Sequence, residues 1–199
     1  MKKHITTLYP RDRQALTALS RTGYIDDNQL HQFWRDKRIK SYLKDGLLAK
    51  DRVSSPGHRE KARICYKLTT AGRELCRKEL GMENMYRAQS PVHDLALADR
   101  YFTLTKEEQA SWRTETEVKN QLEEHLHQMR QDPIEALWAN RIQQDWEQGK
   151  LSMPDAVYTN AEGIEVAFEV VTNHYGRAEI EAKQTVANLL DLKYEEERI

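Results

Sequence analysis

The stretch that decides the fold is Arg35-Asp-Lys-Arg-Ile-Lys-Ser-Tyr-Leu-Lys-Asp-Gly46, followed directly by Leu47-Leu-Ala-Lys-Asp-Arg-Val53. Ile39, Tyr42 and Leu43 fall on one face at helical spacing, while cationic side chains surround the rest of the segment. Gly46 stands where a helix needs a left-handed cap, and the residues after it are typical of a short strand. We therefore predict a basic amphipathic helix over residues 35–45 and a strand over residues 47–53.

The residues on both sides extend this unit. Residues 54–61, Ser-Ser-Pro-Gly-His-Arg-Glu-Lys, form a basic, turn-rich segment, and residues 62–68 alternate apolar and polar side chains like a half-buried strand. Thr69 caps a further helix that reaches residue 80. Upstream, residues 10–20 and 26–34 have the spacing and the end signals of two short helices. The expected order is three helices, a strand, a turn, a second strand and a fourth helix.

The segment Leu43-x-x-Gly46-Leu47-Leu48, a basic turn, and then Tyr66-x-Leu68-Thr69-x-x-Gly72 together resemble the winged helix-turn-helix superfamily over residues 10 to 80. The resemblance implies that the helix at 35–45 enters the major groove of DNA and that the turn touches phosphates or the minor groove. The side chains it assigns to DNA contact are Arg35, Lys37, Arg38, Lys40, Ser41 and Lys44 on the helix, with His58, Arg59, Lys61 and Arg63 on the wing.

Charge is sorted along the chain although the net charge is only −1. Residues 1–90 carry 20 basic and 10 acidic side chains, whereas residues 91–199 carry 11 and 22. The basic half predicts a polyanionic partner, because cations that neutralise phosphates gain affinity from counterion release. The plainer alternative is a solvated cationic face. The acidic half is expected to join subunits, bind a partner or gather metal.

Composition bounds the remaining possibilities. No apolar run is long enough for a membrane span and the first residues lack a secretory core, so we expect a cytoplasmic protein with no membrane partner. Cys65 and Cys76 have no metal-ligand spacing and are expected to be reduced structural thiols. His125 and His127 are expected on a helix, where residues two apart diverge and cannot share a metal.

We predict an α+β fold with a first domain at residues 1–82, a linker at 83–90 and a second domain at 91–199. In the second domain, helices are expected at 91–104, from Thr114 to about 130, and from 133 to Gly149. Strands at 156–159 and 164–171 are expected to form a hairpin through the turn 160–163. A closing helix is expected at 177–196, with a solvated charged tail.

The predicted hairpin carries two acidic residues that could bind a metal ion. Asp155 begins one strand and Glu169 lies on the next, so two carboxylates are expected at the same end of the sheet. Glu115 or Glu117, at the start of the preceding helix, could add a third oxygen donor. Such hard donors suit Mg²⁺ or Mn²⁺, which can activate water for phosphodiester hydrolysis. The alternative is that Pro154-Asp155 is only a turn at a strand entry.

The spacing of Pro154-Asp155, thirteen residues and Glu169-Val170-Val171 resembles the PD-(D/E)xK nuclease superfamily. The resemblance implies a small α/β nuclease-like domain with Asp155 and Glu169 as metal ligands. The lysine that this pattern places at position 171 is Val171, so nicking activity depends on Lys183 folding back toward Glu169. The catalytic residues implied for an active enzyme are Glu115, Glu117, Asp155, Glu169 and Lys183.

Four short motifs in order, His93-Asp-Leu-Ala-Leu-Ala-Asp99, Trp112-Arg-Thr-Glu115, Pro154-Asp155 and Phe168-Glu169, resemble the replication-relaxation proteins of mobile elements and the C-type relaxases of mobilisable plasmids. The resemblance implies that His93, Asp99 and Glu115 belong to the architecture around the site.

Three functional hypotheses follow. The first is a mobile-element protein that binds duplex DNA in replication or mobilisation, as part of a relaxosome, with an impaired nuclease-like domain. The second is an active Mg²⁺-dependent nicking endonuclease or relaxase. The third is a transcriptional repressor whose acidic half dimerises. The expected partners are double-stranded DNA, other mobilisation or replication proteins, and a second copy of the chain.

Overall fold

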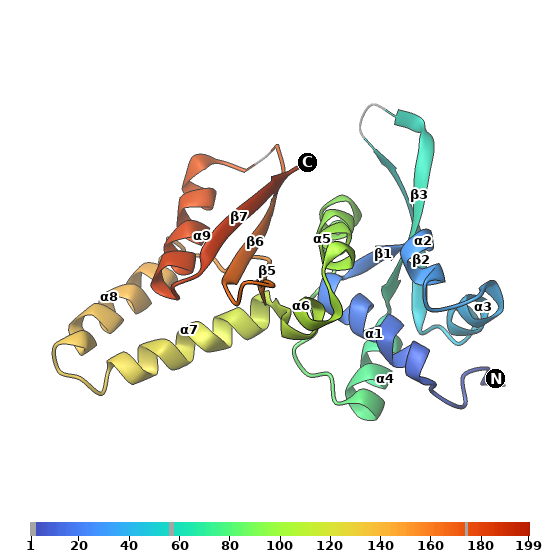
Figure 1. Ribbon diagram of the computed structural model, residues 1–199, viewed down its shortest axis with the longest axis horizontal. Coiled ribbons are helices and arrows are strands. Elements are labelled where there is room, and N and C mark those ends of the chain that lie inside the picture. Colours follow the sequence, from blue (N-terminus) through green and yellow to red (C-terminus); the bar gives the residue numbers. More distant parts are fainter. Residues whose placement is uncertain (1–2, 56–57, 174) are drawn as a thin grey trace. The chain divides into compact units, whose positions relative to one another are not determined.

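The computed structural model describes residues 3–55, 58–173 and 175–199, and the side chains of residues 55–61 lie outside that description. The chain divides into two compact units, residues 1–104 and residues 105–199. Each unit combines helices with a small sheet, which confirms the predicted α+β class (Figure 1). In the described part of the chain, no helix has both the length and the apolar character needed to cross a membrane.

The first unit wraps helices around a three-stranded antiparallel sheet in the order β1-β3-β2. The two long strands β2 and β3 extend together as a ribbon beyond the helices (Figure 1). Its elements in chain order are α1 (Pro10–Thr22), β1 (Tyr24–Asp26), α2 (Asp27–His31), α3 (Asp36–Lys44), β2 (Leu48–Ser55), β3 (His58–Leu68), α4 (Thr70–Leu80) and α5 (Pro91–Thr103).

The end of α3 and the start of α4 follow the sequence signals. Gly46 has φ = 65°, the left-handed conformation that lets the chain leave α3 and enter β2. The Thr69 hydroxyl accepts a hydrogen bond from the Gly72 amide, as expected for an N-cap. A Cβ atom at Gly72 would lie only 2.0 Å from the Leu47 carbonyl oxygen. Glycine at this position therefore allows α4 to pack against the turn after α3.

One ion pair inside the first unit joins α1 to α3. Arg38 donates to both carboxylate oxygens of Asp12, at 2.9 and 2.6 Å, and to the Thr7 carbonyl at 2.7 Å. The Asp12 carboxylate is buried. Its hydrogen bonds with Arg38 raise the pKa of the Arg38 guanidinium above the usual value. Nearby, the Trp34 and Tyr42 rings stack with centroids 4.2 Å apart. Arg38 is thus part of the internal architecture of the unit.

The boundary between the units lies after Leu104, whereas the sequence placed a linker at residues 83–90. Met85 and Tyr86, inside that supposed linker, are buried. The Tyr86 amide donates to the Ser20 carbonyl at 2.8 Å, and Arg73 donates to the carbonyls of both residues. These contacts hold the segment against α1 and α4, because its buried side chains and paired backbone groups would lose their partners on leaving. Helix α5, which follows this segment, therefore belongs to the first unit.

The second unit contains a four-stranded sheet in the order β4-β5-β6-β7. Neighbouring strands are antiparallel except β6 and β7, which are parallel. The elements are α6 (Lys106–Ser111), β4 (Arg113–Thr114), α7 (Glu115–Met129), α8 (Glu135–Glu147), β5 (Ala156–Thr159), β6 (Glu165–Val171), α9 (Arg177–Leu189) and β7 (Lys193–Arg198). Val118, Leu122 and Leu126 of α7 pack with Val157 and Ala167 in the core.

The predicted hairpin is confirmed, but the predicted closing helix was too long. Helix α9 ends at Leu189, and Asp191 adopts a positive φ of 54° that turns the chain. Residues 193–198 then run as β7 along the edge of the sheet instead of continuing the helix into a solvated tail. Charged side chains on such an edge protect its unpaired backbone groups from joining another sheet.

The Arg38–Asp12 pair predicts a large stability effect. Replacing Arg38 with alanine leaves the Asp12 carboxylate buried without its partner, so the first unit should lose about 3 kcal/mol of unfolding free energy. Lys37→Ala is the matched control, because Lys37 is exposed on the same helix, and it should change stability by less than about 0.5 kcal/mol. Urea unfolding followed by tryptophan fluorescence measures both variants. Equal effects would contradict the structural role of Arg38.

Candidate functional site

The strand register brings Asp155 and Glu169 together. Ala156 pairs with Phe168 in the antiparallel β5–β6 ladder, so the next position on each strand is Asp155 and Glu169. The Asp155 amide donates to Glu169 Oε2 at 3.1 Å, and the Val170 amide donates to Asp155 Oδ2 at 2.9 Å. Each carboxylate therefore has one oxygen held by the backbone of the other strand. This exchange fixes both side chains at the same end of the sheet, as predicted.

Lys183 of α9 completes the cluster. Its Nζ lies 2.5 Å from Glu169 Oε1 and 3.8 Å from Asp155 Oδ1, and all three side chains are buried. The Tyr175 ring lies beside the ammonium, with its centroid 5.5 Å from Nζ. Val171 is buried and apolar. The sequence analysis made nicking activity depend on Lys183 folding back toward Glu169, and in the structure Lys183 does contact Glu169.

Burial and charge set the protonation of the cluster. The pKa of Glu169 is raised to about 7, mainly by burial and also by the neighbouring Asp155 carboxylate, while the Lys183 ammonium opposes both effects. Burial alone would lower the pKa of Lys183, but the facing carboxylates hold it above the usual value. When all three groups are ionised, two negative charges face one positive charge. The cluster then has an excess negative charge in a buried place.

The arrangement of oxygens suits a divalent cation. Asp155 Oδ1 and Glu169 Oε1 both face the point held by the Lys183 ammonium. The Glu169 carboxylate is buried, and its Oε1 contacts the Lys183 ammonium. Carboxylate oxygens are the ligands that Mg²⁺ and Mn²⁺ prefer, and Mg²⁺ is commonly held by one or two carboxylates together with water. Asp155 and Glu169 are the residues that would hold such an ion.

The helix glutamates have different positions. Glu117 accepts hydrogen bonds from the Thr114 amide at 2.8 Å and from its hydroxyl at 3.2 Å, so its carboxylate caps α7. A catalytic role for Glu117 stays a prediction. Glu115 is exposed at the first position of α7. Because Thr114 pairs with Ala156 in the antiparallel β4–β5 ladder, the next residue, Glu115, lies opposite Asp155 by register. Across the described ranges, no group of three or more His, Cys, Asp or Glu side chains is arranged to hold a metal ion.

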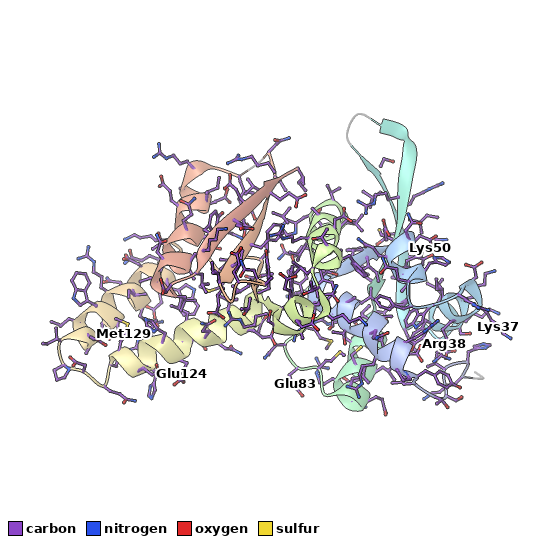
Figure 2. The ribbon with its side chains drawn as sticks, viewed as in Figure 1. Lys37, Arg38, Lys50, Glu83, Glu124 and Met129 are labelled. Carbon is purple, nitrogen blue, oxygen red and sulfur yellow. The ribbon has the colours of Figure 1, made fainter. Side chains whose placement is uncertain are left out.

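Helix α3 carries the exposed cations of the candidate nucleic-acid interface. Lys37 and Arg38 come from this helix and Lys50 from β2 (Figure 2). The exposed cations of α3 and its cap are Arg35, Lys37, Lys40 and Lys44, and the sequence missed two more on β2, Lys50 and Arg52. Their alternation along a strand could have revealed them. The half-buried Ser41 hydroxyl donates to the Lys37 carbonyl one turn earlier, so the Ser41 side chain bonds to its own helix.

Two of the predicted DNA-contacting arginines are instead engaged within the protein. Arg38 binds Asp12, as described above. Arg63 donates to Asp99 at 2.9 and 3.0 Å and to Asp26 at 2.7 Å, which links β3 to α5 and to the end of β1. These carboxylates raise the pKa of Arg63 above its usual value. The side chains of His58, Arg59 and Lys61, also predicted to contact DNA, lie outside the described residues.

Two of the three residues that the family resemblance placed around the site, His93 and Asp99, have partners within the first unit. Asp99 accepts from Arg63 and from the Gln29 amide group at 2.8 Å. His93 is buried, with Nδ1 3.3 Å from Asp94 Oδ1. Burial raises the pKa of Asp94, while His93 lowers it.

Comparison of the chain with models of known protein families and with curated proteins finds no match.

The pKa of Glu169 predicts a pH-dependent stability difference. Between about pH 4.5 and pH 7 the folded chain keeps a proton on Glu169 that the unfolded chain has lost. Stability from this group is therefore present at low pH and is lost as pH rises through 7. Glu169→Gln removes that loss, so its unfolding free energy relative to wild type should increase with pH, by on the order of 3 kcal/mol. Urea unfolding from about pH 5 to about pH 8 measures the difference.

The control for this experiment is Glu162→Gln, which alters an exposed carboxyl in the turn between β5 and β6. Its difference from wild type should stay constant over the same pH range. A constant difference for Glu169→Gln as well would show that Glu169 titrates like an exposed carboxyl.

Proposed function

We propose that the chain is a metal-dependent DNA-nicking endonuclease of a mobile genetic element, with a relaxase-type role in replication or mobilisation. Its first unit recognises duplex DNA, and its second unit hydrolyses one phosphodiester bond. One observation carries the proposal: Lys183 lies against both Asp155 and Glu169. Val171 therefore no longer argues for an impaired site, because the lysine of the nuclease pattern is supplied from α9.

The first unit supports the DNA-binding part of the proposal. The order α1-β1-α2-α3-β2-β3, with an antiparallel sheet β1-β3-β2, is the order expected of a winged helix. In a helix-turn-helix the second helix of the motif lies in the major groove, and here that helix is α3. Arg35, Lys37, Lys40 and Lys44 are exposed along it, and β2 and β3 form the ribbon that serves as the wing.

The second unit supports the hydrolytic part. A divalent cation, when bound, would polarise the phosphate and lower the pKa of a water molecule. Asp155 and Glu169 are fixed by backbone amides, so their oxygens need little rearrangement to hold the ion. Lys183 is cationic in this environment and would stabilise negative charge on the phosphate during hydrolysis. Glu115 is the nearest additional acid by strand register.

A second candidate function is a DNA-binding regulator that does not cut. Glu169 is 0% exposed, as expected of a closed structural ion pair. Leu137 and Trp138 of α8 and its N-cap residue Ile134 are also exposed, and an apolar surface of this kind is typical of an interaction site. This hypothesis gives the second unit the task of joining another copy of the chain or a protein of replication or mobilisation. A nicking assay separates the two functions.

The nuclease proposal predicts metal-dependent nicking of a supercoiled plasmid that carries the DNA flanking the gene for this chain. Asp155→Ala should abolish nicking in Mg²⁺ or Mn²⁺, and Lys183→Ala should lower the rate at least about 100-fold, because a group stabilising transition-state charge is lost. Arg177→Ala is the control, since Arg177 is exposed on the same helix as Lys183. Agarose gels quantify the open-circle product. An inactive wild type would favour the non-cutting regulator, and full activity in Asp155→Ala would reject this cluster as the catalytic site.

The DNA-binding proposal predicts a change in salt dependence. Lys37→Ala and Lys40→Ala should each reduce the slope of log affinity against log salt concentration by about 1, because each removes one phosphate contact. Lys119→Ala, on an exposed position of α7, is the matched control and should leave the slope unchanged. Fluorescence anisotropy with a duplex at several salt concentrations measures the slopes. Unchanged slopes in both α3 variants would show that DNA does not bind this face.

A further inference from the structure

A cavity of about 790 Å³ lies beside the start of α3, within the first unit. The N-terminal segment, the first turn of α1 and the connection from α2 to α3 all contribute to its lining. The size is within the range of sites that hold small molecules or single groups of a larger ligand. The Asp155–Glu169–Lys183 cluster does not line this cavity, so the nicking chemistry proposed above leaves it unexplained.

The lining has an excess of positive charge. Arg11, Arg35 and Lys37 are exposed around the opening. Asp12 is the one carboxylate among the lining residues, and Arg38 neutralises it through two hydrogen bonds. An anionic ligand such as a phosphate therefore fits the rim, since three further cations remain to receive it.

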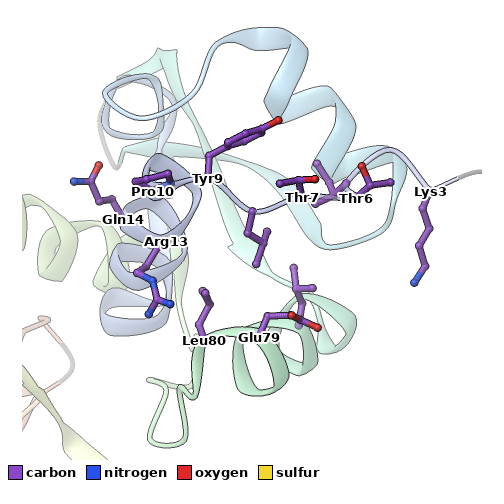
Figure 3. A pocket seen from close by; sticks show the side chains of 12 residues that line it. Lys3, Thr6, Thr7, Tyr9, Pro10, Arg13, Gln14, Glu79 and Leu80 are labelled. Carbon is purple, nitrogen blue, oxygen red and sulfur yellow. The ribbon is translucent and has the colours of Figure 1, made fainter.

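The cavity also has an exposed aromatic ring. Tyr9 is 58% exposed, and the Arg38 guanidinium carbon lies 5.3 Å from its ring centroid. Arg38 is at the same distance from the Tyr42 ring, so its guanidinium contacts both aromatic rings. Figure 3 shows Tyr9 just before Pro10 at the start of α1, where it also borders a neighbouring cavity formed with α4. The exposed surface of a ring supported in this way is a typical platform for a flat group.

Trp34 also contributes to the lining, but its indole Nε1 is buried and faces no open space. The polar groups available to a ligand are therefore the exposed cations of the rim. The lining thus combines a flat aromatic surface with a phosphate-binding rim.

We infer that this cavity binds an unpaired nucleotide of DNA, with the base on Tyr9 and the phosphate on Arg11, Arg35 and Lys37. An unpaired nucleotide is required because both faces of a base inside a duplex are covered by its neighbours. Arg35 and Lys37 belong to the same helix that we propose for duplex recognition, so a strand that leaves the duplex can reach the rim. The choice of DNA as partner rests on the proposed function, whereas the cavity itself does not depend on nicking.

The test compares a blunt duplex with the same duplex carrying a short unpaired thymidine extension, at either end, by fluorescence anisotropy. Of the two extended duplexes, the one that wild type binds more tightly should bind about tenfold more tightly than the blunt duplex, because one stacked base contributes that much affinity. Tyr9→Phe should keep this gain. Tyr9→Ala should bind the blunt duplex like wild type and gain nothing from the extension. Trp138→Ala, which removes an exposed aromatic ring from α8, is the matched control and should keep the gain.

A second measurement separates this inference from the proposed function. Binding of a short oligothymidine is followed by quenching of the intrinsic fluorescence, with an oligoglutamate of similar charge as competitor. Tyr9-dependent oligothymidine binding without any duplex binding would support the cavity and reject duplex recognition. The inference is overturned if no extension tightens wild-type binding, if Tyr9→Ala weakens both duplexes equally, or if oligoglutamate competes as well as oligothymidine does.

Discussion

The contact of one ammonium with two buried carboxylates is the interaction on which the second unit depends. The register of β5 and β6 forces Asp155 and Glu169 into neighbouring positions, and their like charges oppose burial there. Lys183 offsets that repulsion because α9 packs against the sheet and directs its side chain into the cluster. The single positive charge balances only one carboxylate. We interpret the remaining negative charge as the reason why a cation would be attracted to this point.

The first unit uses a similar interaction with a different result. Arg38 and Asp12 carry equal and opposite charges, and the guanidinium satisfies both carboxylate oxygens. Such a balanced pair fixes α1 against α3 and has no excess charge to attract an ion. The exposed lysines of α3 then stand on a rigid support, and Tyr9 is held by the same arginine. One internal ion pair thus shapes both the proposed DNA-reading face and the cavity beside it.

The sequence predicted the neighbouring positions of Asp155 and Glu169, but it predicted the surrounding elements less well. The alternation of apolar residues and the turn at 160–163 were enough to place Asp155 opposite Glu169, because strand register follows from the period of two. The position of Lys183 could be posed only as a condition, since it depends on how α9 packs. Strand β7 was missed because Lys193-Tyr-Glu-Glu-Glu-Arg198 has a helix-compatible composition, and its pairing with β6 is a tertiary effect. Composition alone also could not separate the internal Arg38 from the exposed Lys37, because both are cations of the same helix and only the packing of α1 shows which one faces Asp12.

Diffraction from Mn²⁺-soaked crystals of this protein tests the central claim most directly. The account predicts an anomalous peak in coordination contact with Asp155 Oδ1 and Glu169 Oε1, with Lys183 displaced from the 2.5 Å contact that it makes with Glu169 here. The same crystals of Asp155→Ala should show no peak at that place. A wild-type structure in which Mn²⁺ binds elsewhere, and in which Lys183 keeps both carboxylates at neutral pH or above, would contradict the claim that this cluster is a metal-dependent catalytic site.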